Sequence, residues 1–270
     1  MQVMNEHAKP CGWTLVSLRP QGQHAALRAA VAHSGGRVIA LSPWRLARRN
    51  DTEGAAALSA ALDASAVIFT SPAAVEAAAT YSDLFLNAPR RPWLGVGEGT
   101  LRALKRHGIG HATAPARMDS EGLLALPALA DVADEPIGLV TAPGGRGLIA
   151  AHLQAGGARL VRADVYQRLP LRIPARALAR LSSSAHPWVV AVSSGEALER
   201  VWAQLSPAWQ ARWHSDASVV VASERLAAQA RALGLDRCTL AHGPTARQMA
   251  DAAMRAAAAS GAPVEPASAG

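Results

Sequence analysis

The sequence of 270 residues predicts an α/β protein built on parallel sheets. Short runs that are apolar on both faces alternate with stretches of helical periodicity, the pattern of parallel strands covered by helices on both sides. Hydrophobic residues make up 50% of the chain and charged residues 17%, which excludes intrinsic disorder. With only 2 cysteines, the chain cannot be a disulfide framework and is expected to be a reduced protein.

The strands are expected where apolar residues follow one another without helical spacing. Strong runs are Trp13–Leu18, Arg37–Leu41, Ala66–Thr70, Trp93–Gly97, Ile137–Thr141, Trp188–Ser193 and Ala217–Ala222, and weaker ones are Ile109–Ala114, Arg159–Val165 and Arg237–His242. None approaches the ~18 apolar residues of a membrane span. The polar amino terminus lacks the apolar core of a signal peptide, so we expect a soluble, cytoplasmic protein without a membrane partner.

Helices are expected between these strands, where apolar residues recur at helical spacing. The expected helices are Gln21–His33, Thr100–His107, Glu121–Leu129, Leu148–Ala155, Glu196–Leu205 and Arg225–Leu233. The low-complexity stretch Ala256–Gly270 has almost no large apolar side chains. It is expected to be a disordered end.

The two halves of the chain resemble each other at a constant offset. The helix that ends before Gly35-Gly36 corresponds to the one that ends before Gly156-Gly157, and Thr70-Ser71 corresponds to Val192-Ser193. Such pairs lie about 120–126 residues apart, which indicates two copies of one domain-sized unit. Two similar domains are expected to create a cleft, the usual place for a ligand.

Nearly every strong strand is followed by a small, polar or glycine-rich turn that opens a helix. These turns are Arg19-Pro20, Thr70-Ser71-Pro72, Gly97-Glu98-Gly99-Thr100, Pro143-Gly144-Gly145-Arg146, Ser193-Ser194-Gly195, Ser223-Glu224-Arg225 and Gly243-Pro244-Thr245. In parallel sheets such turns gather at the carboxyl ends of the strands, where free helix N–H groups bind anions. Any single turn is equally explained by helix capping alone. The number of turns, with a net charge of +7, indicates a ligand that carries many anionic groups.

Other site classes lack their characteristic residues. Gly95-Val96-Gly97-Glu98-Gly99 only approximates a dinucleotide fingerprint, and the glycine turn at Gly144 lacks the Lys-Ser/Thr pair of a phosphate loop. The 9 histidines have no metal-ligand spacing. The arginines are scattered rather than grouped around aromatic residues, so no nucleic-acid partner is expected.

The turns also carry a family resemblance in chain order from about Trp13 to Met254. The matching segments are Arg19-Pro20, Val67–Val75, Val96-Gly97 with Thr100, Asp119–Leu124, Gly144-Gly145-Arg146 with Gly156-Gly157, Val165–Arg168, Ser193–Gly195, Ser223–Leu226 and Pro244-Thr245. Together they resemble the uroporphyrinogen-III synthase family. One departure is Ala73, where the family commonly has Asn, so this chain lacks the side chain that would make a polar contact at that turn.

The resemblance implies two flavodoxin-like parallel-sheet domains with exchanged first strand–helix units, joined by a two-stranded linker. Transferred to this chain, residues 13–37 with 173–258 form domain 1 and residues 44–164 form domain 2. The linker strands are then 38–43 and 165–172, and the flexible tails are 1–12 and 259–270.

The family's reaction implies hydroxymethylbilane as substrate, a linear tetrapyrrole with an acetate and a propionate on every ring. Closure with inversion of the last ring and loss of water gives uroporphyrinogen III, without cofactor or metal. Tyr166 is the candidate acid for departure of the hydroxyl, although a packed hinge residue explains it equally well. The candidate substrate-binding residues are Arg19, Ser71, Thr100, Arg146, Ser193, Ser194, Ser223 and Thr245.

The resemblance also leads us to expect a monomer, with hydroxymethylbilane synthase as a transient partner. Two other functions remain open at this stage. One is a non-catalytic two-domain module that binds an anionic small molecule. The other is a nucleotide-dependent transferase, which the missing phosphate loop disfavours.

Overall fold

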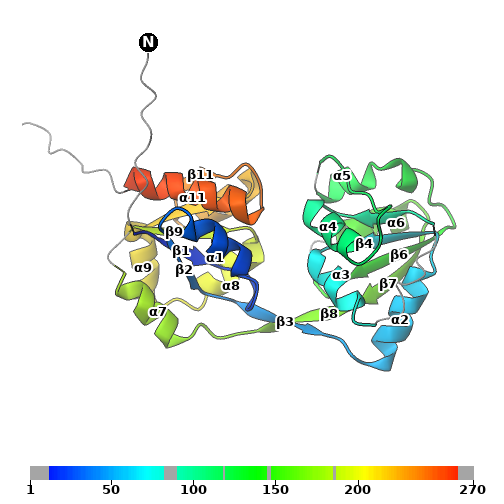
Figure 1. Cartoon of the computed structure of the whole chain (residues 1–270), viewed down its shortest axis with the longest axis horizontal. Coiled ribbons are helices and arrows are strands. Elements are labelled where there is room, and N and C mark those ends of the chain that lie inside the picture. Colours follow the sequence, from blue (N-terminus) through cyan, green and yellow to red (C-terminus); the bar gives the residue numbers. More distant parts are fainter. Residues whose placement is uncertain (1–11, 82–89, 118, 145–146, 185–186, 261–270) are drawn as a thin grey trace, which may run out of the picture. The chain divides into compact units, whose positions relative to one another are not determined.

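The computed structural model describes residues 12–81, 90–117, 119–144, 147–184 and 187–260. The chain forms two compact units (Figure 1). Unit 1 comprises the described residues of Met1–Arg45 and Pro170–Gly270, and unit 2 those of Leu46–Leu169. The chain passes between them in β3 (Trp44–Arg48) and β8 (Tyr166–Pro170), which form a two-stranded sheet.

Unit 1 contains a five-stranded sheet in the order β11-β10-β9-β1-β2. Its strands are β1 (Thr14–Ser17), β2 (Arg37–Ala40), β9 (Trp188–Val192), β10 (Ala217–Val221) and β11 (Cys238–Leu240). Every neighbouring pair is parallel. The strands β1, β9 and β10 are buried along their whole length, as expected of central strands covered on both faces.

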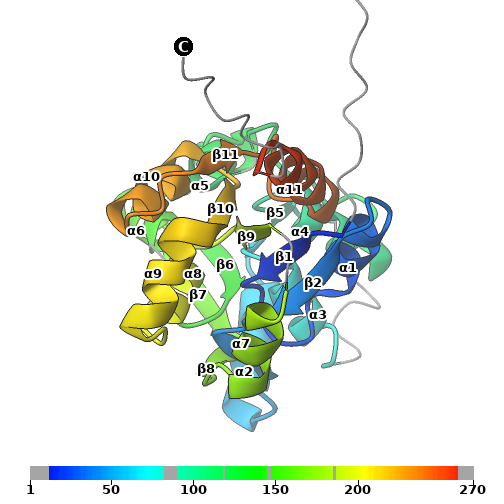
Figure 2. The same ribbon diagram turned by 90° about the vertical axis from the view of Figure 1, so that its left-hand side faces the viewer.

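Helices cover both faces of this sheet (Figure 2). They are α1 (Ala25–Ala32), α7 (Ala175–Ser182), α8 (Gly195–Trp202), α9 (Pro207–Asp216), α10 (Glu224–Ala232) and α11 (Ala246–Ser260). Helices α1 and α11 pack on one face, in a core cluster that includes Trp13, Leu27, Val31 and Met249. Helices α8 to α10 lie on the other face.

Helix α11 corrects the expectation of a disordered end from Ala256. Ala256 and Ala257 are buried in the core of unit 1, and the Ser260 hydroxyl lies 2.9 Å from the Ser218 hydroxyl of β10. Alanine is the strongest helix former, and its small side chain lets the helix lie close to the sheet. The remainder of both predicted tails, residues 1–11 and 261–270, lies outside the described residues.

Unit 2 contains a four-stranded parallel sheet in the order β5-β4-β6-β7. Its strands are β4 (Ala66–Phe69), β5 (Trp93–Gly95), β6 (Pro136–Thr141) and β7 (Arg159–Asp164). The expected strand Ile109–Ala114 contributes only an isolated parallel bridge between Leu94 and Thr113. The α/β class with parallel sheets is therefore confirmed in both units.

Two apolar clusters cover the faces of this sheet. The helices of unit 2 are α2 (Thr52–Leu62), α3 (Pro72–Ala78), α4 (Glu98–Arg106), α5 (Ser120–Leu124), the 3-10 helix η1 (Pro127–Leu129) and α6 (Leu148–Ala155). Helices α2, α3 and α4 pack with Val67 and Phe69 on one face. Helices α5 and α6 pack with Ile68 and Leu139 on the other, so alternate residues of β4 point to opposite faces.

The first of the two strands that join the units differs in place from the expected linker, whereas β8 lies within the expected second linker, residues 165–172. Residues 38–40, expected in the first linker, lie in β2 of the unit 1 sheet. The chain crosses at residues 45–46 and 169–170, within β3 and β8. Among the described residues, no helix combines the length and apolar character needed to cross a membrane.

Candidate functional site

Two candidate residues of unit 2, Ser71 and Tyr166, lie at the carboxyl end of its sheet. Ser71 follows β4 and is the N-cap of α3, and Tyr166 begins β8 directly after β7 and Val165. Both line one cavity of about 200 Å³. The described lining residues are Thr70, Ser71, Val96, Ser120, Leu139, Thr141, Ala142, Gly144, Gly147, Leu148, Ile149, Ala150, Arg162, Tyr166 and Arg168.

Tyr166 and Ser71 are in direct contact in this cavity. The Ser71 Oγ lies 3.2 Å from the Tyr166 hydroxyl, and it also accepts a hydrogen bond from the Ala74 amide at 3.1 Å. The Tyr166 side chain is nearly buried and packs in the core cluster that contains Phe69. A phenol whose ring is fixed by packing and whose hydroxyl faces a cavity is well placed to donate a proton to a ligand.

Arginine supplies the charge of this cavity. Among its described lining residues, the charged side chains are Arg162 and Arg168, and none is acidic. The Arg162 guanidinium donates to the Asp164 carboxylate at 3.0 Å and to the Ala142 carbonyl oxygen at 3.2 Å, which fixes its plane. Asp164 compensates part of the Arg162 charge, and the described lining, with two arginines and no acidic side chain, is suited to an anionic group. Its volume is below the ~300–1,000 Å³ that holds a whole small molecule, so it fits one part of a larger ligand.

Sequence reasoning missed most of these polar residues. Thr70 directly follows β4 and Thr141 ends the adjacent strand β6, and the Thr70 hydroxyl donates to the Thr141 hydroxyl at 2.8 Å. The available signal was their position, because polar residues that end neighbouring parallel strands meet at one edge of the sheet. Arg162 carried a weaker signal, a basic residue in an exposed position of an edge strand.

Two other expected residues of unit 2 are not among the lining residues. Thr100 lies in the first turn of α4 with only 3% of its surface exposed, and its side chain packs against Gly95. This places Thr100 in the core. Arg146 lies outside the described residues.

In unit 1, Arg19 and Thr245 belong to turns that meet. The Arg19 guanidinium donates to the Pro244 carbonyl oxygen at 3.3 Å. Thr245 and Gln248 form a capping box. The Thr245 hydroxyl donates to the side-chain Oε1 of Gln248 at 2.7 Å and accepts from the backbone N–H of Gln248 at 3.3 Å. Partial burial lowers the pKa of Arg19 from its ordinary value, yet an arginine keeps its charge in proteins.

The serines of unit 1 begin two helices at the same edge. Ser194 is the N-cap of α8 and accepts from the Ala197 amide at 3.3 Å. Ser223 is the N-cap of α10 without a side-chain capping bond, and Ser193 is exposed. Capping therefore occupies Ser194 and Thr245, whereas Ser193 and Ser223 make no capping bond with their side chains.

His24 is a buried polar residue that sequence reasoning did not single out. Its Nδ1 lies 2.9 Å from the Ser17 hydroxyl and its Nε2 lies 2.9 Å from the Ser42 hydroxyl. Burial lowers the pKa of His24, and the charges of Arg28 and Arg19 lower it further. The neutral ring thus links the last residue of β1 to the turn that follows β2.

Metal ligands do not gather in the part of the chain that the structure describes, where no group of three or more His, Cys, Asp or Glu side chains could hold an ion.

Comparisons with known proteins assign the family. The family model described as uroporphyrinogen-III synthase HemD matches residues 25–251. The chain is 31% identical over 240 residues to uroporphyrinogen-III synthase of Salmonella typhimurium, covering 87% of this chain and 92% of that protein. It is 34% identical over 115 residues to the Escherichia coli protein of the same name, a match that spans 43% of this chain and 47% of that protein.

Solved structures show the same fold at low identity. A mutant uroporphyrinogen III synthase from Thermus thermophilus superposes with a TM-score of 0.61 at 17% identity, covering 90% of this chain and 98% of that one. The Helicobacter pylori protein gives a TM-score of 0.57 at 13% identity, covering 90% and 99%. Taken with the family model over residues 25–251, these likenesses show that the chain belongs to the uroporphyrinogen-III synthase family.

Proposed function

We propose that this chain closes hydroxymethylbilane to uroporphyrinogen III with inversion of the last pyrrole ring and loss of water, as a cyclising carbon–oxygen lyase. The observation that carries the proposal is the family match over residues 25–251. The arginine-lined cavity beside Tyr166 agrees with a substrate that carries carboxylates on every ring.

Tyr166 is proposed as the proton donor to the departing hydroxyl. The Ser71 hydroxyl has its oxygen engaged by the Ala74 amide, so its own proton is free to point at the Tyr166 oxygen. In that arrangement the phenol proton points away from Ser71, toward the ligand. The same hydrogen bond stabilises the negative charge that develops on the phenol oxygen when the proton leaves. Water then departs, and the cationic carbon left behind is attacked by the inverting ring.

The protein must determine which isomer forms by the way it positions the substrate. The linear tetrapyrrole also closes without a catalyst, and that closure retains the orientation of the last ring. The protein therefore has to hold the carboxylates so that the attacking carbon is the one that leads to inversion. Arg19, Ser193, Ser194, Ser223 and Thr245 of unit 1 are the proposed carboxylate-binding residues there. In unit 2 the proposed carboxylate-binding residue is Arg162, added from the structure, because the Ser71 hydroxyl is engaged by Tyr166 and by the Ala74 amide.

We further propose that the two units are copies of one flavodoxin-like domain with exchanged first strand–helix units. Within unit 1, numbering its strands in chain order gives the order 5-4-3-1-2, which is the flavodoxin-like order read from the other edge. In unit 2, β6 and β7 lie about 122 residues after β1 and β2, and the sheet order matches when they are equated. The catalytic form is proposed to be a monomer that receives its substrate from hydroxymethylbilane synthase.

The product isomer tests this function. Porphobilinogen and hydroxymethylbilane synthase are incubated with and without the chain, and the porphyrins are separated after oxidation. We expect type III in the presence of the chain and type I in its absence. Type I alone in both reactions would refute the proposed function and favour the binding module.

A further inference from the structure

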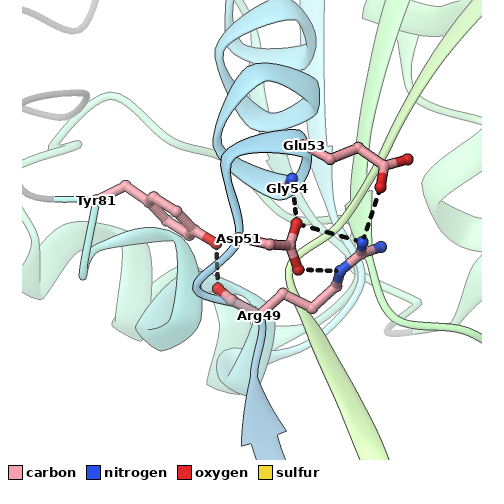
Figure 3. A network of polar contacts seen from close by, with 5 residues as sticks. All are labelled: Arg49, Asp51, Glu53, Gly54 and Tyr81. Atoms are coloured by element: carbon pink, nitrogen blue, oxygen red, sulfur yellow. Dashed lines mark hydrogen bonds and ion pairs between the residues drawn. The ribbon is translucent and has the colours of Figure 1, made fainter.

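A cluster of polar contacts surrounds the point where β3 enters unit 2, and we call it the Arg49 cluster. Its members are Arg49, Asp51, Glu53, Gly54 and Tyr81 (Figure 3). Arg49 directly follows β3, and Val165 directly precedes Tyr166 at the start of β8. The Arg49 amide donates to the Val165 carbonyl oxygen at 3.0 Å, so the cluster holds the residue next to Tyr166.

Both peptide groups of Arg49 have partners, and so does its side chain. The Tyr81 hydroxyl donates to the Arg49 carbonyl oxygen. The guanidinium Nε donates to Asp51 Oδ2 at 3.1 Å, and a second nitrogen lies 3.5 Å from Glu53 (Figure 3). Asp51 is itself fixed, because its other oxygen caps α2 by accepting the Gly54 amide at 2.6 Å. That amide and Arg49 lower the pKa of Asp51, which keeps it ionised.

Helix α3 connects this cluster to the candidate acid. Ser71, the N-cap of α3, lies against the Tyr166 hydroxyl, and Tyr81 lies just beyond the end of the same helix. The contacts therefore close a ring from Ser71 through α3 to Tyr81, then to Arg49, Val165 and back to Tyr166. The Tyr81 ring packs against the core cluster that also contains Tyr166, so both tyrosines belong to one packed core.

We propose that Tyr81, acting through Arg49, is a positioning residue that fixes the Tyr166 phenol relative to Ser71. The inference rests on the proposed function, because it assigns the consequence to proton donation by Tyr166. Removing the Tyr81 hydroxyl opens the ring at one bond and leaves the aromatic packing in place. The expected result is a misplaced phenol, which slows turnover more than it weakens substrate binding.

A measurement independent of activity uses the fact that the chain has 2 tyrosines. With tyrosine labelled by ¹³C at Cζ, the Tyr81→Phe variant retains a single resonance, that of Tyr166. We expect this resonance to move from its wild-type position, because the phenol changes its hydrogen bonding to Ser71. The substituted phenylalanine keeps the ring, so the ring current at Tyr166 is little changed. An unmoved resonance would overturn the proposal, whatever product the wild-type protein makes.

The matched control is Thr80→Val. The Thr80 hydroxyl donates to the Ala77 carbonyl oxygen at 2.7 Å, so this variant also loses one hydroxyl hydrogen bond at the end of α3 without touching Arg49. We expect the Tyr166 resonance of Thr80→Val to stay at its wild-type position. Movement of the same size in both variants would show a general loosening of α3 and would contradict a specific role for Tyr81.

Kinetics then test whether Tyr81 acts through Tyr166. In the isomer assay we expect Tyr81→Phe to lower kcat roughly tenfold with KM within about twofold of wild type. In a Tyr166→Phe background the same change is expected to have no further effect on kcat, because the group being positioned is gone. If the losses of kcat caused by Tyr81→Phe and Tyr166→Phe multiply in the double variant, the proposal is refuted. A wild-type protein that makes only type I would instead refute the proposed function, and the NMR comparison would still decide the positioning.

Discussion

Replacement of Tyr166 by phenylalanine separates a catalytic phenol from a packed hinge residue. The variant keeps the ring in the core and loses one hydrogen bond, the 3.2 Å contact with Ser71 Oγ. That bond contributes about 0.5–1.5 kcal/mol to stability, and the Ser71 hydroxyl that loses its acceptor is only partly buried and lines the cavity, where water can replace the phenol. We therefore expect a stability loss of about 1 kcal/mol or less, which lowers Tm by roughly 2–4 °C.

The effect on the reaction is expected to be far larger than the effect on stability. A positioned acid contributes about 10²–10⁴ in rate, which corresponds to roughly 3–5 kcal/mol of barrier. Initial rates of type III formation should fall by that factor, while product affinity, measured by titration, stays near wild type. A fall of less than about threefold would assign Tyr166 to packing alone. Ser218→Ala, which removes a hydroxyl contact of 2.9 Å in unit 1, is the control and should keep its rate.

Two further predictions concern stability. A methyl group at Gly138 in β6 would meet the Ala61 carbonyl oxygen and lie 2.9 Å from the Ala61 carbonyl carbon. We therefore expect Gly138→Ala to lower the free energy of unfolding, measured by chemical denaturation, by about 3 kcal/mol. The control is Gly110→Ala, whose added methyl group meets nothing within 4 Å and should leave the free energy of unfolding unchanged. Equal stability of these variants would contradict the close approach of α2 to the sheet. The pKa of His24 is lower in the folded state than in the unfolded state, so the unfolded state takes up the proton first as the pH falls. The stability that neutral His24 contributes is therefore fully present above pH ~6.5 and is lost as the pH falls below that value toward the folded-state pKa. Wild-type Tm should therefore fall more steeply than that of His24→Gln between about pH 7 and pH 5, and parallel curves would exclude His24 as the cause.

Strands were predictable because burial on both faces leaves an unbroken apolar run. Ala66–Phe69 and Trp188–Val192 are buried throughout, and the expected runs differ from them by one residue at one end. The linker strand β3 was not predicted, because Trp44 is the one buried residue of Trp44–Arg48 and the strand carries two arginines. Helix α11 was misread because its buried face is made of alanine, which hydrophobic periodicity detects poorly.

The sequence indicated where the site lies, at the carboxyl ends of the strands, better than it indicated which side chains line it. Ser71 lines the cavity, as its position after a parallel strand suggested, and so does Tyr166, which the family resemblance singled out. Thr100 occupies an equivalent turn but faces inward against Gly95, and a single turn does not reveal which face of a helix is buried. Tyr81 and Arg49 were beyond sequence reasoning, because their contact joins residues 32 positions apart through a backbone carbonyl group.

Binding of the tetrapyrrole at the carboxyl ends of both sheets is tested most directly by amide chemical shifts in the 28.0 kDa chain as uroporphyrinogen III is added. The largest shifts are expected in the turns after β4 and β6 of unit 2 and after β9 and β10 of unit 1. The residues at the opposite ends of these strands should stay unchanged. Shifts that gather at those opposite ends, or that spare one unit entirely, would contradict this arrangement of the site.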